Sequence, residues 1–223
     1  MKTSEAIEGI IFDMDGVLCD SEPFICEAAM EMFRQTYGLT VKKEDFLAFV
    51  GAGEDRFVGG VGEKYGIEMT MPRDKLRTYE IYLKIIAGRL HPLPGAVEFV
   101  SGCRAAGKKI ALATAADAIK MRGNLHELGI APETFHAIIT GDDVQRKKPD
   151  PQVFLLAAKR LDLAPSVCVV VEDAINGVKA AKAAGARCLG ITTSFEAEKL
   201  RESGADWTAE NLASVPSDLH WVR

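Results

Sequence analysis

The sequence predicts an α/β fold: a doubly wound parallel sheet with an inserted α-helical cap domain. Short apolar runs recur along the chain, and each ends in polar residues, as buried strands of a parallel sheet do. Segments with helical periodicity separate most of these runs, which is the pattern of successive βαβ units. The runs are Ile10–Phe12, Ile110–Ala113, Ala137–Thr140, Val167–Val171 and Arg187–Ile191.

One long stretch, from about Glu22 to Arg89, interrupts this alternation. It contains no strand-like run, and its amphipathic segments predict a small helical bundle inserted directly after the first strand. The segments are Glu22–Tyr37, Lys42–Val50, Arg56–Tyr65 and Arg73–Ile86. We therefore expect a core domain of residues 1–20 and 90–223 and a helical cap domain of residues 21–89.

The chain returns to the core through His91-Pro92-Leu93-Pro94-Gly95. Two prolines and a glycine make a stiff connector here, so we place the hinge between the domains in this segment. Behind it, Ala96–Ala106 is a predicted helix that Gly107 closes, and the βα alternation then continues to the end of the chain.

Composition and charge limit the classes of function. Hydrophobic residues make up 48% and charged residues 26% of the 223 positions, which is ordinary for a globular protein and argues against a disordered chain. The formal net charge is −5 and no block of five like charges occurs, so nucleic acid is not an expected partner. We expect a monomer that binds a small molecule.

The cysteines and the amino terminus predict a cytoplasmic location. The five cysteines are an odd number, and none forms a C-x-x-C pair, which suits a reducing compartment. Residues 1–6 lack a basic region followed by an apolar core, and no window approaches the roughly 18 apolar residues of a membrane span. No contact with a membrane is therefore expected.

Ligands of an open parallel sheet bind beyond the carboxyl ends of its strands, so the polar residues at those ends are the candidate site. The four ends carry Asp13-Met14-Asp15-Gly16, then Thr114, then Lys147-Lys148-Pro149, and finally Glu172-Asp173. Carboxylates, a hydroxyl and a lysine together are the groups that phosphoryl transfer requires.

Asp13 and Asp15 lie two residues apart, which places both side chains on one side of an extended chain, while Gly16 permits a sharp turn behind them. Aspartate and glycine also occur in ordinary turns, but the other strand ends favour a functional pair. In that case Asp13 attacks phosphorus to form an aspartyl phosphate. Asp15 then moves a proton to the leaving oxygen and from the water.

Glu172 and Asp173 add hard oxygen ligands which, with Asp13, suit Mg²⁺. Adjacent residues of a straight strand face opposite ways, so both reach one metal only if the chain bends there. The alternative is an acidic N-cap of the predicted helix Ala174–Ala184.

The remaining strand ends supply groups for the phosphate. The Thr114 hydroxyl and the amides of Ala115 and Ala116 lie where a phosphate would meet a helix amino terminus, which Asp117 is expected to cap. Lys148 precedes a proline and is thereby biased toward extended backbone, which directs a cation at the nucleophile and the phosphate. Lys147 is the competing choice.

Taken in order, these residues resemble the four motifs of the haloacid dehalogenase (HAD) superfamily over essentially the whole chain. The motifs correspond to Phe12–Leu18, Leu112–Thr114, Lys148–Pro151 and Val171–Ala174 with the downstream Gly177 and Ala180-Ala181. A helical cap after the first motif is similar to the β-phosphoglucomutase-like subfamily. Gly16–Cys19 and Gly51–Val61 also resemble the HAD domain of a plant chloroplast protein.

This resemblance implies a Rossmann-like core and an Mg²⁺-dependent phosphatase. It implies that Asp13 is the nucleophile and that Asp15 is the acid and base, with its carbonyl on the metal. Thr114 and Lys148 would bind phosphate, and Glu172 and Asp173 would bind Mg²⁺. Dehalogenation is disfavoured, because the dehalogenases lack the second aspartate and need no metal.

The cap favours hydrolysis of a small phosphorylated metabolite over a phosphomutase reaction. The resemblance places Ile25 where β-phosphoglucomutases have a catalytic histidine, Gly53-Glu54 where they have a cap arginine, and Thr78 near their cap lysine. Glu22, Glu54 and Arg56 are the candidate substrate contacts of the cap. A mutase and a binding module without turnover stay as alternatives.

Overall fold

The computed structural model describes residues 6–49 and 53–215, which contain a six-stranded parallel sheet. The strands are β1 (Gly9–Phe12), β2 (Lys109–Ala113), β3 (Ala137–Ile139), β4 (Cys168–Glu172), β5 (Arg187–Ile191) and β6 (Trp207–Ala209). Their order is β3-β2-β1-β4-β5-β6, so the direction of winding reverses between β1 and β4. The predicted doubly wound α/β fold is confirmed.

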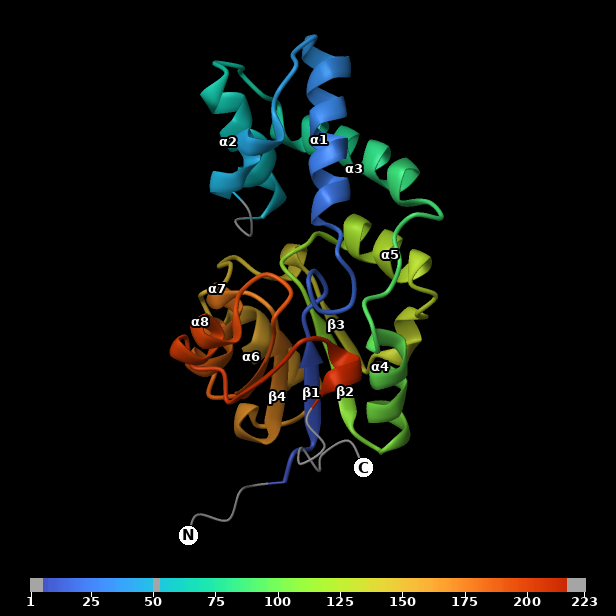
Figure 1. The fold of residues 1–223 in the computed structure, drawn as a ribbon, viewed down its shortest axis with the longest axis vertical. Helices are drawn as coiled ribbons and strands as arrows, with labels where there is room; N and C mark the ends of the chain where they lie inside the picture. The colour runs from blue at the N-terminus through green and yellow to red at the C-terminus, as the bar shows by residue number, and fades with distance from the viewer. Residues whose placement is uncertain (1–5, 50–52, 216–223) are drawn as a thin grey trace.

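Helices cover both faces of the sheet, which explains why its strands are apolar throughout (Figure 1). Ile10 and Phe12 pack in one core cluster with α4 and α5, whereas Ile11 faces the opposite cluster with α6, α7 and α8. The five helices are α4 (Ala96–Ala105), α5 (Ala118–Glu127), α6 (Gln152–Arg160), α7 (Ile175–Ala183) and α8 (Ala197–Glu202). Two separate apolar layers thus hold the sheet rigid beneath the strand ends.

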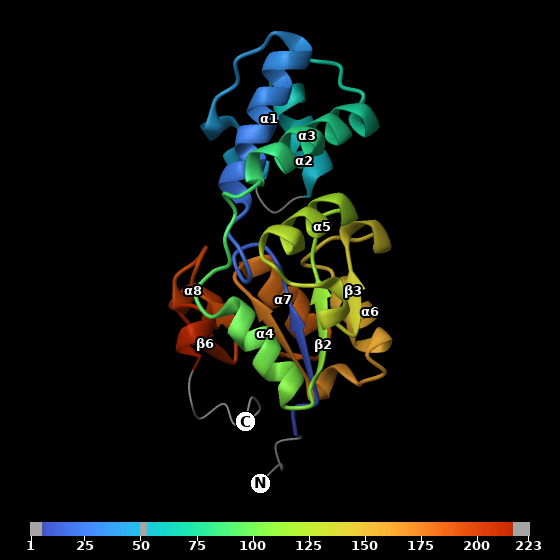
Figure 2. The same ribbon diagram turned by 90° about the vertical axis from the view of Figure 1, so that its right-hand side faces the viewer.

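The insertion between β1 and β2 is helical, and it lies beyond one end of the sheet (Figures 1 and 2). Its helices are α1 (Glu22–Tyr37), α2 (Glu54–Lys64) and α3 (Met71–Ile86), with a 3₁₀ segment over Lys43–Phe49. Phe46 packs between Phe33 and Phe57, with ring centroids 6.4 and 4.8 Å away. The insertion therefore has apolar packing of its own, and we continue to call residues 21–89 the cap.

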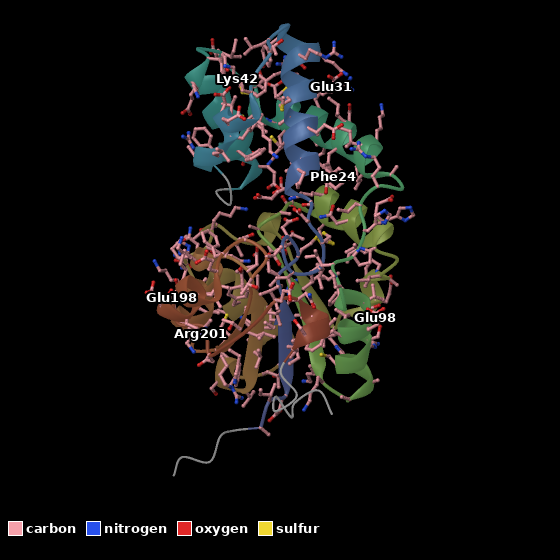
Figure 3. All side chains as sticks on the ribbon, viewed as in Figure 1. Phe24, Glu31, Lys42, Glu98, Glu198 and Arg201 are labelled. Atoms are coloured by element: carbon pink, nitrogen blue, oxygen red, sulfur yellow. The ribbon has the colours of Figure 1, made fainter. Side chains whose placement is uncertain are left out.

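The two linkers between cap and core run side by side. The amide of Leu93 donates to the carbonyl of Leu18 at 2.9 Å, and Cys19 forms an isolated bridge with Pro92. Phe24, on the first turn of α1, lies near the junction (Figure 3), and the guanidinium of Arg89 lies 5.1 Å from the centre of its ring. The predicted connector, residues 91–95, is thus hydrogen-bonded to residues 18–19, which lead from the core into the cap.

The structure corrects several predicted boundaries. Within the segment predicted as Lys42–Val50, residues Lys43–Phe49 form a 3₁₀ helix and Val50 lies outside the described residues; α2 begins at Glu54 instead of Arg56. Strand β6 was not predicted, because Trp207-Thr208-Ala209 is too short to form a distinct apolar run. The cap segment Gly51–Val61 resembles the plant chloroplast protein, and its first two residues, Gly51 and Ala52, lie outside the described residues.

All five cysteines are buried and free. Among the described residues, no helix is both long enough and apolar enough to cross a bilayer.

Candidate active site

Asp13 lies at the centre of the strand ends, immediately after β1. Its amide donates to the carbonyl of Val171 at 2.9 Å, which continues the β1–β4 pairing one residue beyond the strand. Its carboxylate is buried, and the ammonium of Lys148 lies 2.6 Å away. The same ammonium lies 2.6 Å from Glu172, so Lys148 joins the residues that follow β1 and end β4.

Three buried carboxylates meet at this point. Ligand oxygens of Asp13, Glu172 and Asp173 all lie within 4.8 Å of one another. The second oxygen of Glu172 accepts the amide of Ala174 at 2.8 Å, and Asp173 accepts a hydrogen bond from the hydroxyl of Ser194. The chain therefore bends enough after β4 to direct both acids to one place.

The charges of this cluster are only partly compensated. Burial is the main reason that the pKa of Asp13 is raised to about 7; the charges of Glu172 and Asp15 also raise this pKa, and Lys148 lowers it. Burial also raises the pKa of Asp173 well above its usual range, with Glu172 and Asp13 adding to the effect. One lysine among three buried carboxylates leaves an excess of negative charge.

This donor set fits a hard divalent cation. Mg²⁺ prefers carboxylate and carbonyl oxygens, and it would supply the positive charge that the cluster lacks. Asp13, Glu172 and Asp173 are the residues in position to hold it. The Asp15 carboxylate is not in this group, so its predicted contribution is limited to the main-chain carbonyl and stays a prediction.

Two glycines make room for the acids. At Gly16, where φ is +74°, an added Cβ would lie 1.9 Å from an oxygen of Asp173. At Gly177, on α7, it would lie 1.8 Å from the carboxyl carbon of Glu172. Both distances are far below van der Waals contact, so the cluster requires glycine at both positions.

Asp15 faces a separate set of partners. It accepts a hydrogen bond from the hydroxyl of Ser21, and its carboxylate lies 2.9 Å from the ammonium of Lys120 on α5. Lys120 is buried and also lies 3.4 Å from the carboxylate of Glu54, at the start of α2. Lys120 therefore connects Glu54 of the cap with Asp15 of the core.

The structure separates the two candidate lysines of the third strand end. Lys148 contacts the acids, whereas Lys147 donates to the carbonyls of Gly141 at 3.0 Å and Ala115 at 3.4 Å. Thr114 is buried, and its hydroxyl accepts the amide of Ala116 at 3.1 Å. Lys147 therefore supports the loop that carries Thr114 and Ala115.

The structure corrects the expected cap at Asp117 and excludes the alternative in which Glu172 or Asp173 caps α7. Asp117 occupies the N-cap position of α5, but its side chain makes no capping bond and lies 2.8 Å from Lys75 of the cap instead. The N-cap of α7 is Ala174, so neither Glu172 nor Asp173 is the cap residue. Glu172 instead pairs with Lys148 and accepts the amide of Ala174, and Asp173 accepts the hydroxyl of Ser194.

The other two proposed cap contacts, Glu22 and Arg56, differ in how near they lie to this network. Glu22 is exposed at the start of α1, near enough to interact electrostatically with Asp15 and Lys120. The guanidinium of Arg56 lies 2.8 Å from Glu63 and 5.1 Å from the centre of the Phe49 ring. Within the described residues, no ion pair connects Arg56 with the strand-end acids.

The sequence reasoning missed Lys120, Ser21 and Ser194. Lys120 and Asn124 are polar residues four apart on the buried side of α5, beside Met121 and Leu125. Polar residues on an otherwise apolar helix face were a usable signal. The two serines lie in segments without a motif, and only the fold brings them to Asp15 and Asp173.

A family model described as haloacid dehalogenase-like hydrolase matches residues 7–185. The chain belongs to this family. It is thus a HAD hydrolase, and the family resemblance drawn from the strand-end motifs is confirmed.

Two curated relatives illustrate its range. The chain is 38% identical to protein SUPPRESSOR OF QUENCHING 1, chloroplastic, of Arabidopsis thaliana. The match covers 94% of this chain but only 20% of the length of the Arabidopsis protein. It is 34% identical to a phosphorylated carbohydrates phosphatase of Thermotoga maritima, covering 89% of this chain and 92% of the relative.

Solved structures of HAD proteins share the fold. CbbY of Rhodobacter sphaeroides, solved with xylulose-(1,5)bisphosphate, is 25% identical with a TM-score of 0.84, covering 93% of this chain and 95% of CbbY. The β-phosphoglucomutase of Clostridium difficile has a TM-score of 0.79 at 22% identity, covering 95% of this chain and 94% of that one. The latter likeness shows the fold alone.

Replacing Gly177 with alanine tests the space that holds Glu172. We expect Gly177→Ala to displace the carboxylate, to destabilise the protein by about 1–3 kcal/mol, and to reduce the rise in melting temperature that Mg²⁺ causes. Gly102→Ala on α4 is the matched control, since an added Cβ there meets nothing within 4 Å. Equal melting temperatures and equal Mg²⁺ shifts for the two variants would contradict this account.

Replacing Lys148 tests the compensation of charge. Lys148→Met leaves Asp13 and Glu172 without their cation, so we expect a loss of about 3 kcal/mol of metal-free stability, part of which Mg²⁺ restores. Lys147→Met removes only bonds to carbonyls, and we expect it to cost about 1 kcal/mol. Chemical denaturation with and without Mg²⁺ measures both, and a larger effect at Lys147 would refute the assignment.

Proposed function

We propose that this HAD hydrolase is an Mg²⁺-dependent phosphatase that hydrolyses a small phosphorylated metabolite, such as a sugar phosphate, through an aspartyl phosphate on Asp13. The observation that carries the proposal is the pairing of each candidate aspartate with its own lysine. Lys148 faces Asp13 inside the acidic cluster, and Lys120 faces Asp15 on the side of the cap. Such an arrangement suits a nucleophile and a separate proton carrier.

In the first half of the proposed reaction, a carboxylate oxygen of Asp13 attacks phosphorus and the bond to the leaving oxygen breaks. Asp13, Glu172 and Asp173, with the carbonyl of Asp15, would hold Mg²⁺, which would supply positive charge to offset the repulsion between the carboxylate and the phosphate. Lys148 neutralises charge from the core side. Thr114 and the amide of Ala115 are the proposed donors to phosphate oxygens.

Asp15 carries the proton in both halves of the reaction. It first donates a proton to the leaving oxygen, so that the leaving group departs as an alcohol. It then takes a proton from the water that attacks phosphorus of phospho-Asp13, so that inorganic phosphate leaves and both aspartates return to their starting forms. The hydroxyl of Ser21 and the ammonium of Lys120 hold its carboxylate in place for this exchange.

Phosphomutase activity is the second candidate, because β-phosphoglucomutases share this fold. Two cap residues argue against phosphomutase activity. Ile25 is buried and apolar at the position of the expected histidine. Thr78 is buried as well, and its hydroxyl donates to the carbonyl of Asp74 within α3 at 2.9 Å. A module that binds without turnover has no need for a second carboxylate held beside the first.

A phosphate-release screen tests the proposal. We expect Mg²⁺-dependent turnover of at least one sugar or polyol monophosphate, abolished by EDTA and reduced more than about a thousandfold in Asp13→Asn. Asp162→Asn is the control, because Asp162 is exposed in the turn after α6 at φ +55°, which asparagine tolerates. Turnover that survives Asp13→Asn, or no turnover of any monophosphate, would overturn the proposal.

An isomerisation assay separates hydrolysis from transfer between sugar hydroxyls. Because the cap lacks the expected mutase residues, we expect no interconversion of a hexose 1-phosphate and 6-phosphate, even with a hexose bisphosphate as activator. The assay monitors both sugar phosphates and inorganic phosphate in one reaction. Isomerisation faster than phosphate release would favour the mutase instead.

A further inference from the structure

We infer that Glu54 makes this site selective for monophosphate esters with an uncharged, hydroxyl-bearing leaving group, and that it disfavours substrates carrying a second anionic group. The inference rests on the proposed phosphatase function and adds the substrate class. Glu54 is at the start of α2, and its carboxylate lies 3.4 Å from the ammonium of Lys120, the lysine partner of Asp15. In the proposed reaction Asp15 faces the leaving oxygen, so Glu54 faces the remainder of the leaving group.

The contacts of Lys120 define the charge of this subsite. Its ammonium lies 2.9 Å from Asp15 and 3.4 Å from Glu54, and its side chain is only 5% exposed. One cation shared between two carboxylates leaves one net negative charge. Lys120 is therefore already engaged and does not offer a free cation to a second phosphate.

The neighbouring contacts of the cap repeat this arrangement. Lys75 of α3 lies 2.9 Å from Asp55 and 2.8 Å from Asp117, again one cation between two acids. In these two sets of contacts, four carboxylates share two lysines. Arg56 does not offset the difference, because its guanidinium pairs with Glu63 at 2.8 Å.

This charge distribution distinguishes two kinds of leaving group. A second phosphate would meet the excess negative charge, or it would have to take Lys120 from a buried carboxylate and leave that acid unpaired. Sugar or polyol hydroxyls face no such cost, because a carboxylate oxygen of Glu54 accepts hydrogen bonds from them. The subsite thus selects through repulsion as well as attraction.

The test compares a hexose monophosphate with the corresponding hexose bisphosphate. We expect wild-type protein to prefer the monophosphate in kcat/KM, and Glu54→Gln to narrow that preference by about tenfold, the scale of removing one charge roughly 10 Å away at an effective dielectric near 20. The change should appear mainly as a lower KM for the bisphosphate. Glu54→Asp keeps the charge and should retain the preference.

Glu68→Gln is the matched control, since Glu68 is an exposed acid of the cap beyond the end of α2. We expect it to leave the ratio unchanged. A wild-type preference for the bisphosphate, or an equal ratio in wild type and Glu54→Gln, would overturn the inference while leaving the phosphatase proposal intact. Circular dichroism and melting temperature establish that each variant is folded.

Binding measurements separate this inference from the proposed function. If wild-type protein releases no phosphate, calorimetry with the two hexose phosphates and Mg²⁺ still gives the ratio of their dissociation constants in wild type and in Glu54→Gln. We expect the same narrowing of the ratio on substitution. An unchanged ratio would refute charge selection by Glu54, whatever the outcome for turnover.

Discussion

Lys148 holds two buried carboxylates, those of Asp13 and Glu172, in positions where they would otherwise repel each other. Removing carboxylates from water costs several kcal/mol each unless they are paired and hydrogen-bonded. The energy to keep them there comes from the two apolar layers on either face of the sheet. The rigid frame of β1 and β4 is therefore what allows an anionic site to exist at their ends.

The two lysines divide the site between the core and the cap. Lys148 contacts acids of the core alone, so the environment of Asp13 is set by the sheet. Lys120 contacts Asp15 of the core and Glu54 of the cap, so the environment of Asp15 depends on both. Under the proposed function, the phosphate end of a substrate is recognised by the frame and the leaving group by the insertion.

The sequence predicted the features that depend on local pattern. Apolar runs marked five of the six strands, because strands buried on both faces are apolar at every position. The strand ends marked Asp13, Thr114, Lys148 and the acidic pair, since parallel strands deliver their carboxyl ends to one edge. Strand β6 was missed, because three residues at the edge of a sheet carry too little pattern.

The partners of these residues depend on tertiary contacts that no local pattern contains. Ser194 reaches Asp173 from a loop beyond β5, and Lys120 reaches Asp15 from 105 residues further along the chain. The cap residues were hardest to predict for the same reason. Glu54 and Arg56 are two residues apart on one helix, yet one joins the site and the other pairs with Glu63.

The cap is attached to the core by contacts of different kinds. The linkers are joined through Leu18 and Leu93, and the buried hydroxyl of Tyr82 on α3 donates to Asn124 on α5 at 2.5 Å. By contrast, α2 reaches the core through the ionic contact of Glu54. A carboxylate has several acceptor sites, so Glu54 is able to accept a hydrogen bond from a hydroxyl while it keeps its ionic contact with Lys120. The part of the cap that faces the leaving group is thus held by a contact in which substrate hydroxyls are able to take part.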